Sequence, residues 1–272
     1  MKIVCECGLS HDGSLGYCYG IIAALAHSGI WGVKFQCHDD DKCNQFRCET
    51  FFPQDATREH QWRRTAFTRG QWQRLAEFVR HNGLAFGVSV FSEQAAKMLE
   101  GAVDFWKVGS GQTSAHNLLS RLRGTAPVVL STGMSDWREI DAAVELLDRE
   151  SLTILQCMTK YPTQPADVGL NVMLELRQRY GCKAGLSDHS GALWPGIVAA
   201  SMGADMLEVH VCWDRRQWGP DTSSSLTVGD VWQLADGIKF IEAMTPVDKS
   251  QLSWGQLEHK RTFSQCAESA SA

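Results

Sequence analysis

The chain has 272 residues, of which 44% are hydrophobic, and a formal net charge of -5. That length can bury a large core and suits one barrel-sized domain over residues 1–272. The charge is mild and the basic residues are dispersed, so neither nucleic acid nor an anionic membrane is an expected partner. No apolar run approaches the roughly 20 residues that span a bilayer.

Short apolar runs recur along the chain at intervals typical of a strand followed by a helix. In chain order they cover residues 3–6, 31–36, 85–89, 105–110, 128–132, 152–159, 184–189 and 206–210. Eight strands alternating with helices are typical of an α/β fold of the (β/α)8, or TIM barrel, type.

Helical patterns occupy several of the intervals between these strands. The helix expected over residues 15–28 stops before Gly29, and Thr68 precedes another that runs to residue 79. Ser135 and Asp136 open a helix over 135–147, with Glu139 as a capping partner. Two more are expected over 195–202 and 227–241. The longest polar insertion, residues 37–64, is either a loop that covers a substrate or a solvated excursion.

The start of the chain and its cysteines favour a reducing compartment. The first strand begins at residue 3, which leaves no room for a signal peptide. The ten cysteines lack paired zinc-type spacing, and Cys5, Cys7, Cys157 and Cys212 fit small buried hydrophobic positions better than a disulfide framework. We therefore expect a cytoplasmic protein.

Polar residues gather where the expected strands end. Because the C-terminal strand ends of a barrel converge on one mouth, these side chains should meet in space. They are Lys34, Gln36, Lys107, Ser110, Ser131, Ser187, Asp188, His189, Glu208 and His210. A buried ammonium without a partner is costly, so the two lysines favour an anionic ligand. Two histidines on adjacent strands can hold one open-sited metal ion.

A series of motifs resembles the catalytic barrel of the sialic acid synthase family, which includes the N-acetylneuraminate, legionaminate and pseudaminate synthases. The match runs from residue 3 to about residue 226. It comprises ECGLSHDG at 6–13, VKFQ at 33–36, WKVGSG at 106–111, LSTGM at 130–134, YPT at 161–163, LSDH at 186–189, EVH at 208–210 and GPD at 219–221.

The resemblance implies an enzyme that condenses phosphoenolpyruvate with an aldehyde acceptor, an N-acetylated amino sugar, to give a nonulosonic acid and phosphate. It assigns a divalent cation, Mn2+ with Mg2+ or Co2+ as alternatives, to His189 and His210. Substrate binding falls to Lys34, Gln36, Ser110, Ser131, Tyr161 and Ser187. Catalysis falls to Lys107 and to the two carboxylates Glu6 and Asp221, which would orient a water or accept its proton.

Several positions depart from the family pattern. Ser10 replaces an asparagine before His11, Gln112 replaces an acidic residue, Thr159 replaces an asparagine and Thr222 replaces a histidine. The phosphoenolpyruvate and metal positions are kept, whereas the acceptor side is altered.

The family's C-terminal antifreeze-like domain is also expected to be absent, because a polar tail follows residue 258. Either a separate protein provides the cap, or the acceptor is a smaller or differently shaped aldehyde that needs none. A homodimer is the alternative assembly to a complex with a separate capping protein.

Two other functions stay open at this stage. A lyase or aldolase could act on a 2-keto acid through a Schiff base on Lys107 or Lys34. A non-catalytic barrel could bind an anionic ligand, as the replacements Gln112 and Thr222 would allow. The retention of Lys34, Lys107, His189, His210 and Asp221 argues against a decayed site.

Overall fold

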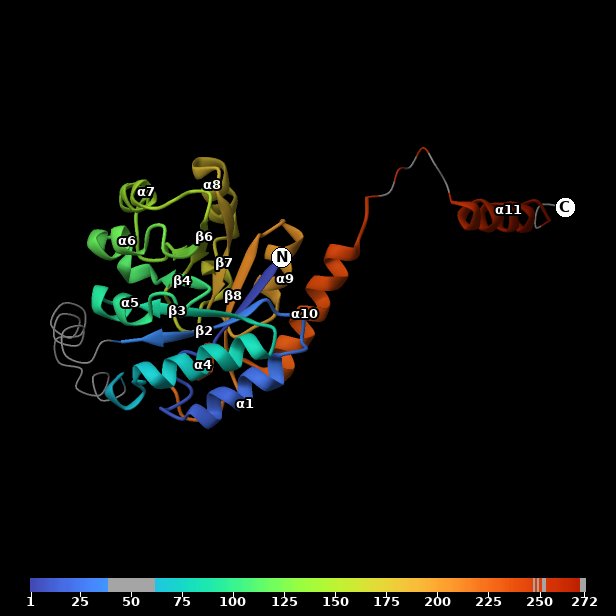
Figure 1. Ribbon diagram of the computed structural model, residues 1–272. Helices are drawn as coiled ribbons and strands as arrows, with labels where there is room; N and C mark the ends of the chain where they lie inside the picture. The colour runs from blue at the N-terminus through green and yellow to red at the C-terminus, as the bar shows by residue number, and fades with distance from the viewer. Residues whose placement is uncertain (39–61, 247, 249, 251–252, 270–272) are drawn as a thin grey trace. The chain divides into compact units, whose positions relative to one another are not determined.

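The structure, a computed structural model, describes residues 1–38, 62–246, 248, 250 and 253–269. Within these residues, eight parallel strands close into a barrel (Figure 1). Each strand pairs with the next, and the pairing of β1 with β8 closes the ring. The strands are β1 (Lys2–Glu6), β2 (Gly32–Cys37), β3 (Ala85–Val90), β4 (Phe105–Val108), β5 (Val128–Ser131), β6 (Leu152–Cys157), β7 (Lys183–Asp188) and β8 (Met206–Cys212). The expected TIM barrel is confirmed.

Helices pack around the strands and seal the outer core. They are α1 (Leu15–Leu25), α4 (Arg69–His81), α5 (Glu93–Leu99), α6 (His116–Leu122), α7 (Trp137–Leu146), α8 (Leu170–Tyr180), α9 (Trp194–Ser201) and α10 (Val228–Ala243). Short 3-10 turns η1 (Ser110–Gln112), η2 (Pro165–Asp167) and η3 (Thr222–Ser224) follow β4, β6 and β8, and β9 (Leu226–Thr227) pairs with the end of β8. The capping partner expected at the start of α7 forms a capping box with Asp136, and α4 also begins with a capping box, formed by Thr68 and Gln71.

Three expected boundaries were two or three residues too late, among them the end of β6, which lies at Cys157 rather than residue 159. Helix α1 ends at Leu25 rather than residue 28, because the amide and hydroxyl of Ser28 both donate to the Leu25 carbonyl and form a turn. Strand β4 ends at Val108 rather than residue 110, because the Gln112 amide donates to the Gly109 carbonyl and starts η1.

The barrel interior is layered by the two-residue alternation of strand side chains. A separate inner apolar cluster consists of Val4, Phe105, Val129, Leu155 and Met206. Two residues further along the same strands come Glu6, Lys107, Ser131, Cys157 and Glu208. The apolar layer therefore fills the barrel interior on the N-terminal side, and the next layer toward the C-terminal strand ends is polar.

The chain divides into two compact units, Met1–Ile241 and Glu242–Ala272. The second contains α11 (Trp254–Ser269), in a stretch that the sequence had suggested was a polar tail. Ser253 caps this helix by accepting from the Gln256 amide, 3.3 Å away. The expectation of a single domain over 1–272 stays a prediction.

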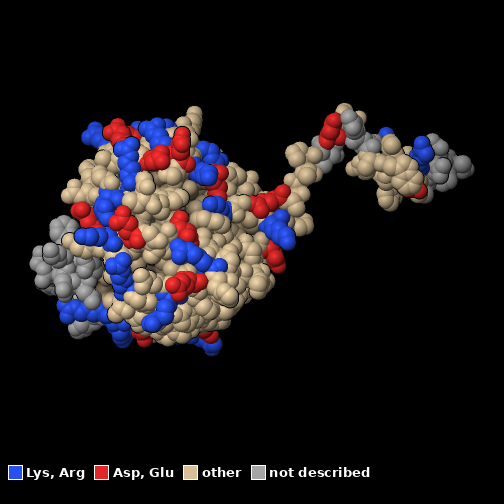
Figure 2. Space-filling view, in the orientation of Figure 1, with Lys and Arg blue, Asp and Glu red and all other residues tan. Residues whose placement is uncertain are grey.

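On the face shown in Figure 2, residues of both charge signs are interspersed. Among the described residues, no helix is both long and apolar enough to cross a bilayer. Most of the insertion at 37–64 lies outside the described residues, so its role as a substrate-covering loop stays a prediction.

Candidate active site

A cavity of about 400 Å³ opens at the C-terminal ends of the barrel strands. The residues that were given a role from the sequence all line it: Glu6, Lys34, Gln36, Lys107, Ser110, Ser131, Tyr161, Ser187, His189, His210 and Asp221. Asp188, which was expected at the mouth, is not among the lining residues. The closed barrel brings these side chains together, because each lies on or just after a strand whose end faces the same mouth. Their chemical roles are a separate question.

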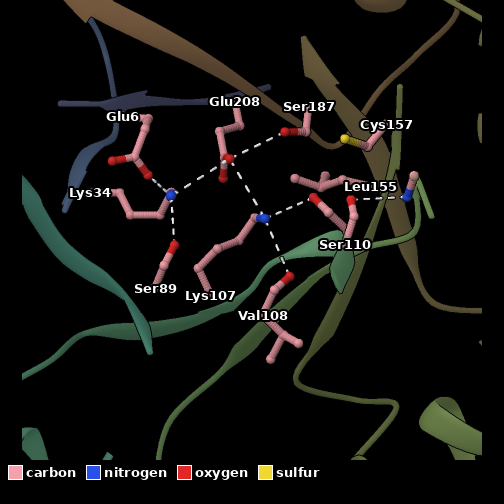
Figure 3. A network of polar contacts seen from close by, with 12 residues as sticks. Glu6, Lys34, Ser89, Lys107, Val108, Ser110, Leu155, Cys157, Ser187 and Glu208 are labelled. Carbon is pink, nitrogen blue, oxygen red and sulfur yellow. Dashed lines mark hydrogen bonds and ion pairs between the residues drawn. The ribbon is translucent and has the colours of Figure 1, made fainter. Parts of the chain in front are cut away.

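Two buried lysines share one carboxylate at the floor of the cavity (Figure 3). The Oε1 atom of Glu208 lies 3.7 Å from the Lys34 ammonium and 3.6 Å from the Lys107 ammonium. The Ser187 hydroxyl donates to the same oxygen at 3.2 Å. All three ionisable side chains are at most 4% exposed, so solvent screens their interactions only weakly.

Each lysine has a serine beside it. Lys34 donates to the Ser89 hydroxyl and Lys107 to the Ser131 hydroxyl, both at 2.8 Å. Lys34 also forms an ion pair with Glu6. An anionic ligand at this floor would therefore meet two cations and the hydroxyls next to them, an arrangement suited to phosphate and carboxylate groups.

Burial and charge set the protonation of this floor. Burial lowers the pKa of Lys34 to about 7, because it outweighs the opposing effect of the Glu208 carboxylate, and Lys107 adds a smaller lowering. Burial alone would raise the pKa of Glu208, but the Lys107 and Lys34 ammonium groups lower it overall. Glu208 is therefore ionised, and Lys34 can change its charge near neutral pH.

The two histidines lie next to each other on the β7 and β8 side. Their ring centroids are 5.1 Å apart. The Met158 carbonyl lies 3.0 Å from His189 Nδ1, which favours a proton on that nitrogen and leaves Nε2, 3.0 Å from the Tyr161 hydroxyl, as the free lone pair. Burial lowers the pKa of His210 well below its usual value, so its imidazole is neutral, as a metal ligand must be.

Two adjacent imidazoles fit a divalent cation. Burial disfavours the charged form of His189, but Cys157 and the Met158 carbonyl raise its pKa overall, so a cation bound here would displace a proton from that ring. No group of three or more His, Cys, Asp or Glu in the described part of the chain is placed to hold a metal ion. The protein would thus supply two ligands and leave the other positions to water and substrate.

Asp221 approaches the histidines from the segment after β8. Its Oδ2 lies 3.7 Å from His210 Nδ1. A Cβ atom at Gly8 would come within 3.0 Å of the same carboxylate oxygen. Glycine at position 8 therefore leaves room for this carboxylate at the cavity wall.

The turn after β5 also requires a glycine. A Cβ at Gly133 would lie 2.6 Å from the Thr159 hydroxyl and 2.8 Å from the Cys157 carbonyl oxygen. The Gly133 amide donates to the Ser110 hydroxyl at 3.0 Å, which ties this turn to the end of β4.

The cavity contains residues that the sequence reasoning did not select. Ser89, Met134 and Cys157 line it beside the expected set. Ser89 was detectable in principle, since it is a polar residue at the end of an expected strand. Glu208 was expected at the mouth without a role, and it lines the cavity. The departures Gln112 and Thr159 also line it, whereas Thr222 is buried and donates to the Gly219 carbonyl at 3.0 Å.

The tryptophans at 62, 194, 213 and 218 divide into two groups by their exposure. Trp62 is buried, lines the cavity and stacks on His38 with ring centroids 4.6 Å apart. Trp194, Trp213 and Trp218 are exposed. The cysteines Cys5, Cys7, Cys157 and Cys212 are free and buried, as expected.

Comparison with known proteins identifies the family. The NeuB family model matches residues 21–249. The chain belongs to the NeuB family. Human N-acetylneuraminate-9-phosphate synthase is 28% identical over 254 residues, covering 88% of this chain and 70% of the relative. Pseudaminic acid synthase of Helicobacter pylori is 28% identical over 275 residues, covering 96% and 80%.

Solved structures agree on the fold. The N-acetylneuraminic acid synthetase of Leptospira borgpetersenii superposes with a TM-score of 0.84 at 23% identity, covering 96% of this chain and 90% of that one. At this family level, the chain is similar to nonulosonic acid synthases, as the motifs indicated, and the acceptor is not fixed at such identities.

Proposed function

We propose that this NeuB-family protein condenses phosphoenolpyruvate with an aldehyde acceptor, an N-acetylated amino sugar, and releases a nonulosonic acid and phosphate. The observation that carries the proposal is the pair of buried lysines with adjacent serines, in the same cavity as two adjacent histidines. Family membership and the printed activities of the relatives support it.

The cavity floor would bind phosphoenolpyruvate. Lys34 and Lys107 would neutralise its phosphate and carboxylate groups, and the hydroxyls of Ser110, Ser131 and Ser187 would donate hydrogen bonds. Gln36 and Tyr161 would complete the substrate contacts. Because these groups are fixed by strand ends, they would be preorganised for the developing charge.

The reaction joins the methylene carbon of phosphoenolpyruvate to the aldehyde carbon. A divalent cation, Mn2+ in the first place, held by His189 and His210 would polarise the aldehyde oxygen. Glu6 and Asp221 would orient a water toward the enol carbon and accept its proton. Cleavage of the carbon–oxygen bond then expels phosphate, whose charge Lys107 would stabilise.

The decisive experiment measures phosphate release from phosphoenolpyruvate with Mn2+ and a panel of aldehydes, with and without a chelator. The panel includes N-acetylmannosamine and di-N-acetylated 6-deoxy hexoses. Release that needs one aldehyde and stops with chelator supports the proposal and identifies the acceptor class. Absence of both release and phosphoenolpyruvate binding would refute it.

One observation favours a second candidate. The lowered pKa of Lys34, about 7, would make part of its amine neutral and nucleophilic, as a Schiff-base lyase requires. Borohydride trapping with a 2-keto acid separates the two mechanisms, since the proposed condensation forms no covalent adduct on lysine. A non-catalytic barrel would bind phosphoenolpyruvate and release no phosphate with any aldehyde.

The assembly of the site is a further proposal. We expect either a homodimer or a separate capping protein to cover the acceptor side, and a cytoplasmic location for the enzyme. Light scattering of the purified chain tests the first alternative. Recovery of activity on adding a second protein tests the other.

A further inference from the structure

Residues 213–221 connect β8 to η3 and end at Asp221, one of the two carboxylates proposed to act on water. Within this segment, the side-chain amide of Gln217 forms hydrogen bonds both with the segment itself and with a neighbouring part of the barrel. Its Oε1 accepts hydrogen bonds from the Trp213 amide at 3.1 Å and the Asp214 amide at 3.4 Å. The side chain therefore closes the first half of the segment into a compact turn.

The nitrogen of the same amide reaches a different part of the barrel. Its Nε2 donates to the Ser10 carbonyl oxygen at 3.2 Å and to the Tyr17 hydroxyl oxygen at 2.8 Å. Ser10 belongs to the loop after β1, and Tyr17 lies in the first turn of α1. One side chain thus fastens the segment after β8 to the loop after β1.

The next residues of the segment stay close to that loop. The Trp218 ring lies 4.3 Å from the Arg64 guanidinium, which forms an ion pair with Asp12 at 2.6 Å. This pair is half exposed and contributes little by itself. A Cβ at Gly219 would come within 3.5 Å of the Ser10 Cα. Contact with the loop after β1 therefore continues from Gln217 to Gly219.

The loop after β1 also contacts the end of the segment 213–221. Asp221 lies against Gly8, whose added Cβ would be 3.0 Å from the carboxylate. The distance between these two loops therefore sets where the Asp221 carboxylate lies relative to His210, 3.7 Å away. Gln217 holds the two loops at that distance through its hydrogen bond to the Ser10 carbonyl oxygen. Among the described side chains of residues 213–221, only Gln217 makes such a bond to Ser10.

We propose that Gln217 is a positioning residue for Asp221 in the reaction proposed above, on which this inference rests. Gln217 lies at the rim and touches neither the lysine floor nor the histidines. Water can replace its hydrogen bonds when it is removed, so the barrel should stay folded while the segment loosens. Displacement of a reacting group by about 1 Å can cost about 100-fold in rate.

The test compares the full chain with Gln217→Ala, Tyr17→Phe and Asp221→Asn, and with Gln94→Ala as a control on the exposed surface of α5. Gln217→Ala should lower kcat about tenfold and leave the Kd for phosphoenolpyruvate within about twofold, because Lys34 and Lys107 lie on other strands. Tyr17→Phe leaves the hydrogen bond from Gln217 to Ser10 intact, so its kcat should fall less than that of Gln217→Ala. Gln94→Ala should change neither quantity.

Two further measurements separate positioning from a structural role. In an Asp221→Asn background, Gln217→Ala should cost nothing more, since both changes disable the same carboxylate. Hydrogen exchange of residues 213–221 should become faster in Gln217→Ala, while α9 stays unchanged.

The outcomes distinguish this inference from the proposed function. An unchanged exchange rate in 213–221, an unchanged kcat, or a full additional loss in the Asp221→Asn background would overturn the positioning role. The hydrogen exchange of 213–221 could become faster in Gln217→Ala while the wild-type chain neither binds phosphoenolpyruvate nor releases phosphate. That result would support the role of Gln217 in holding the two loops together and would overturn the proposed reaction instead.

Discussion

At the scale of single residues, Lys34 should make binding of the proposed substrate depend on pH. Burial lowers its pKa to about 7 against the opposing effect of Glu208. A bound phosphoenolpyruvate anion favours the charged ammonium, so the pKa of Lys34 rises in the complex and binding takes up a proton between the two values. Calorimetry in buffers of different ionisation enthalpy should show uptake at about pH 8 and almost none at about pH 6. Lys34→Arg, which cannot lose its proton, is the control; proton release at the higher pH would contradict the prediction.

Glu6 should oppose binding and assist turnover. Its carboxylate pairs with Lys34 and also accepts from the Gly8 amide, so phosphoenolpyruvate must compete with Glu6 for the same ammonium. Glu6→Gln removes that competitor and should tighten phosphoenolpyruvate binding about tenfold, or about 1.4 kcal/mol. It should also lower kcat, because the amide cannot accept a proton from water.

A charge-matched control tests whether the effect is local. Glu93→Gln removes one exposed carboxylate from the first turn of α5, away from the cavity, and should leave both quantities unchanged. Weaker binding in Glu6→Gln would show that Glu6 holds the lysine in place rather than competing with the substrate. Full turnover in both Glu6→Gln and Asp221→Asn would make the carboxylate assignments wrong.

At the scale of elements, the barrel depends on close approach between β7 and β8, the strands that lead to the two histidines. Gly185 pairs with Met206, and a Cβ at Gly185 would lie 1.9 Å from the Met206 carbonyl oxygen. Backbone cannot yield as a flexible side chain can. Gly185→Ala should therefore lower the free energy of unfolding by about 2 kcal/mol or more, measured by urea denaturation.

The control for this change is a glycine with free space. A Cβ at Gly70, in the first turn of α4, would meet nothing within 4 Å. Gly70→Ala should stabilise the protein by about 0.5–1 kcal/mol through helix propensity and a less flexible unfolded chain. Equal free energies of unfolding for the two variants would show that β7 and β8 can move apart at Gly185 without an energetic cost.

The elements also show how far sequence reasoning reaches. The strands were predictable because apolar runs recur between turn and capping residues, and the convergence of strand ends then predicted which side chains share a cavity. The sharing of Glu208 by two lysines was not predictable, because it depends on the register between β2, β4 and β8. The altered pKa of Lys34 follows from that same arrangement and from burial.

At the scale of the whole molecule, the chain spans 70% of its human relative and 80% of the Helicobacter one. The alignments cover 88% and 96% of this chain. The replacements Gln112 and Thr159 line the cavity on the segments that follow β4 and β6, whereas Lys34 and Lys107 lie within β2 and β4. Differences between relatives should therefore concern the acceptor more than phosphoenolpyruvate.

The folding unit of the molecule can be defined by truncation. In the described residues, every member of the two hydrophobic core clusters lies at or before Ile238, and the compact unit Met1–Ile241 contains the whole barrel. In α11, Trp254 and Phe263 are more than 70% exposed, and an isolated helix of that length is marginal in water. A chain ending at Ala243 should thus keep its Tm within about 2 °C, equivalent to less than about 1 kcal/mol. Calorimetry of both chains checks this. A markedly lower Tm for the shortened chain would mean that one cooperative domain extends over residues 1–272.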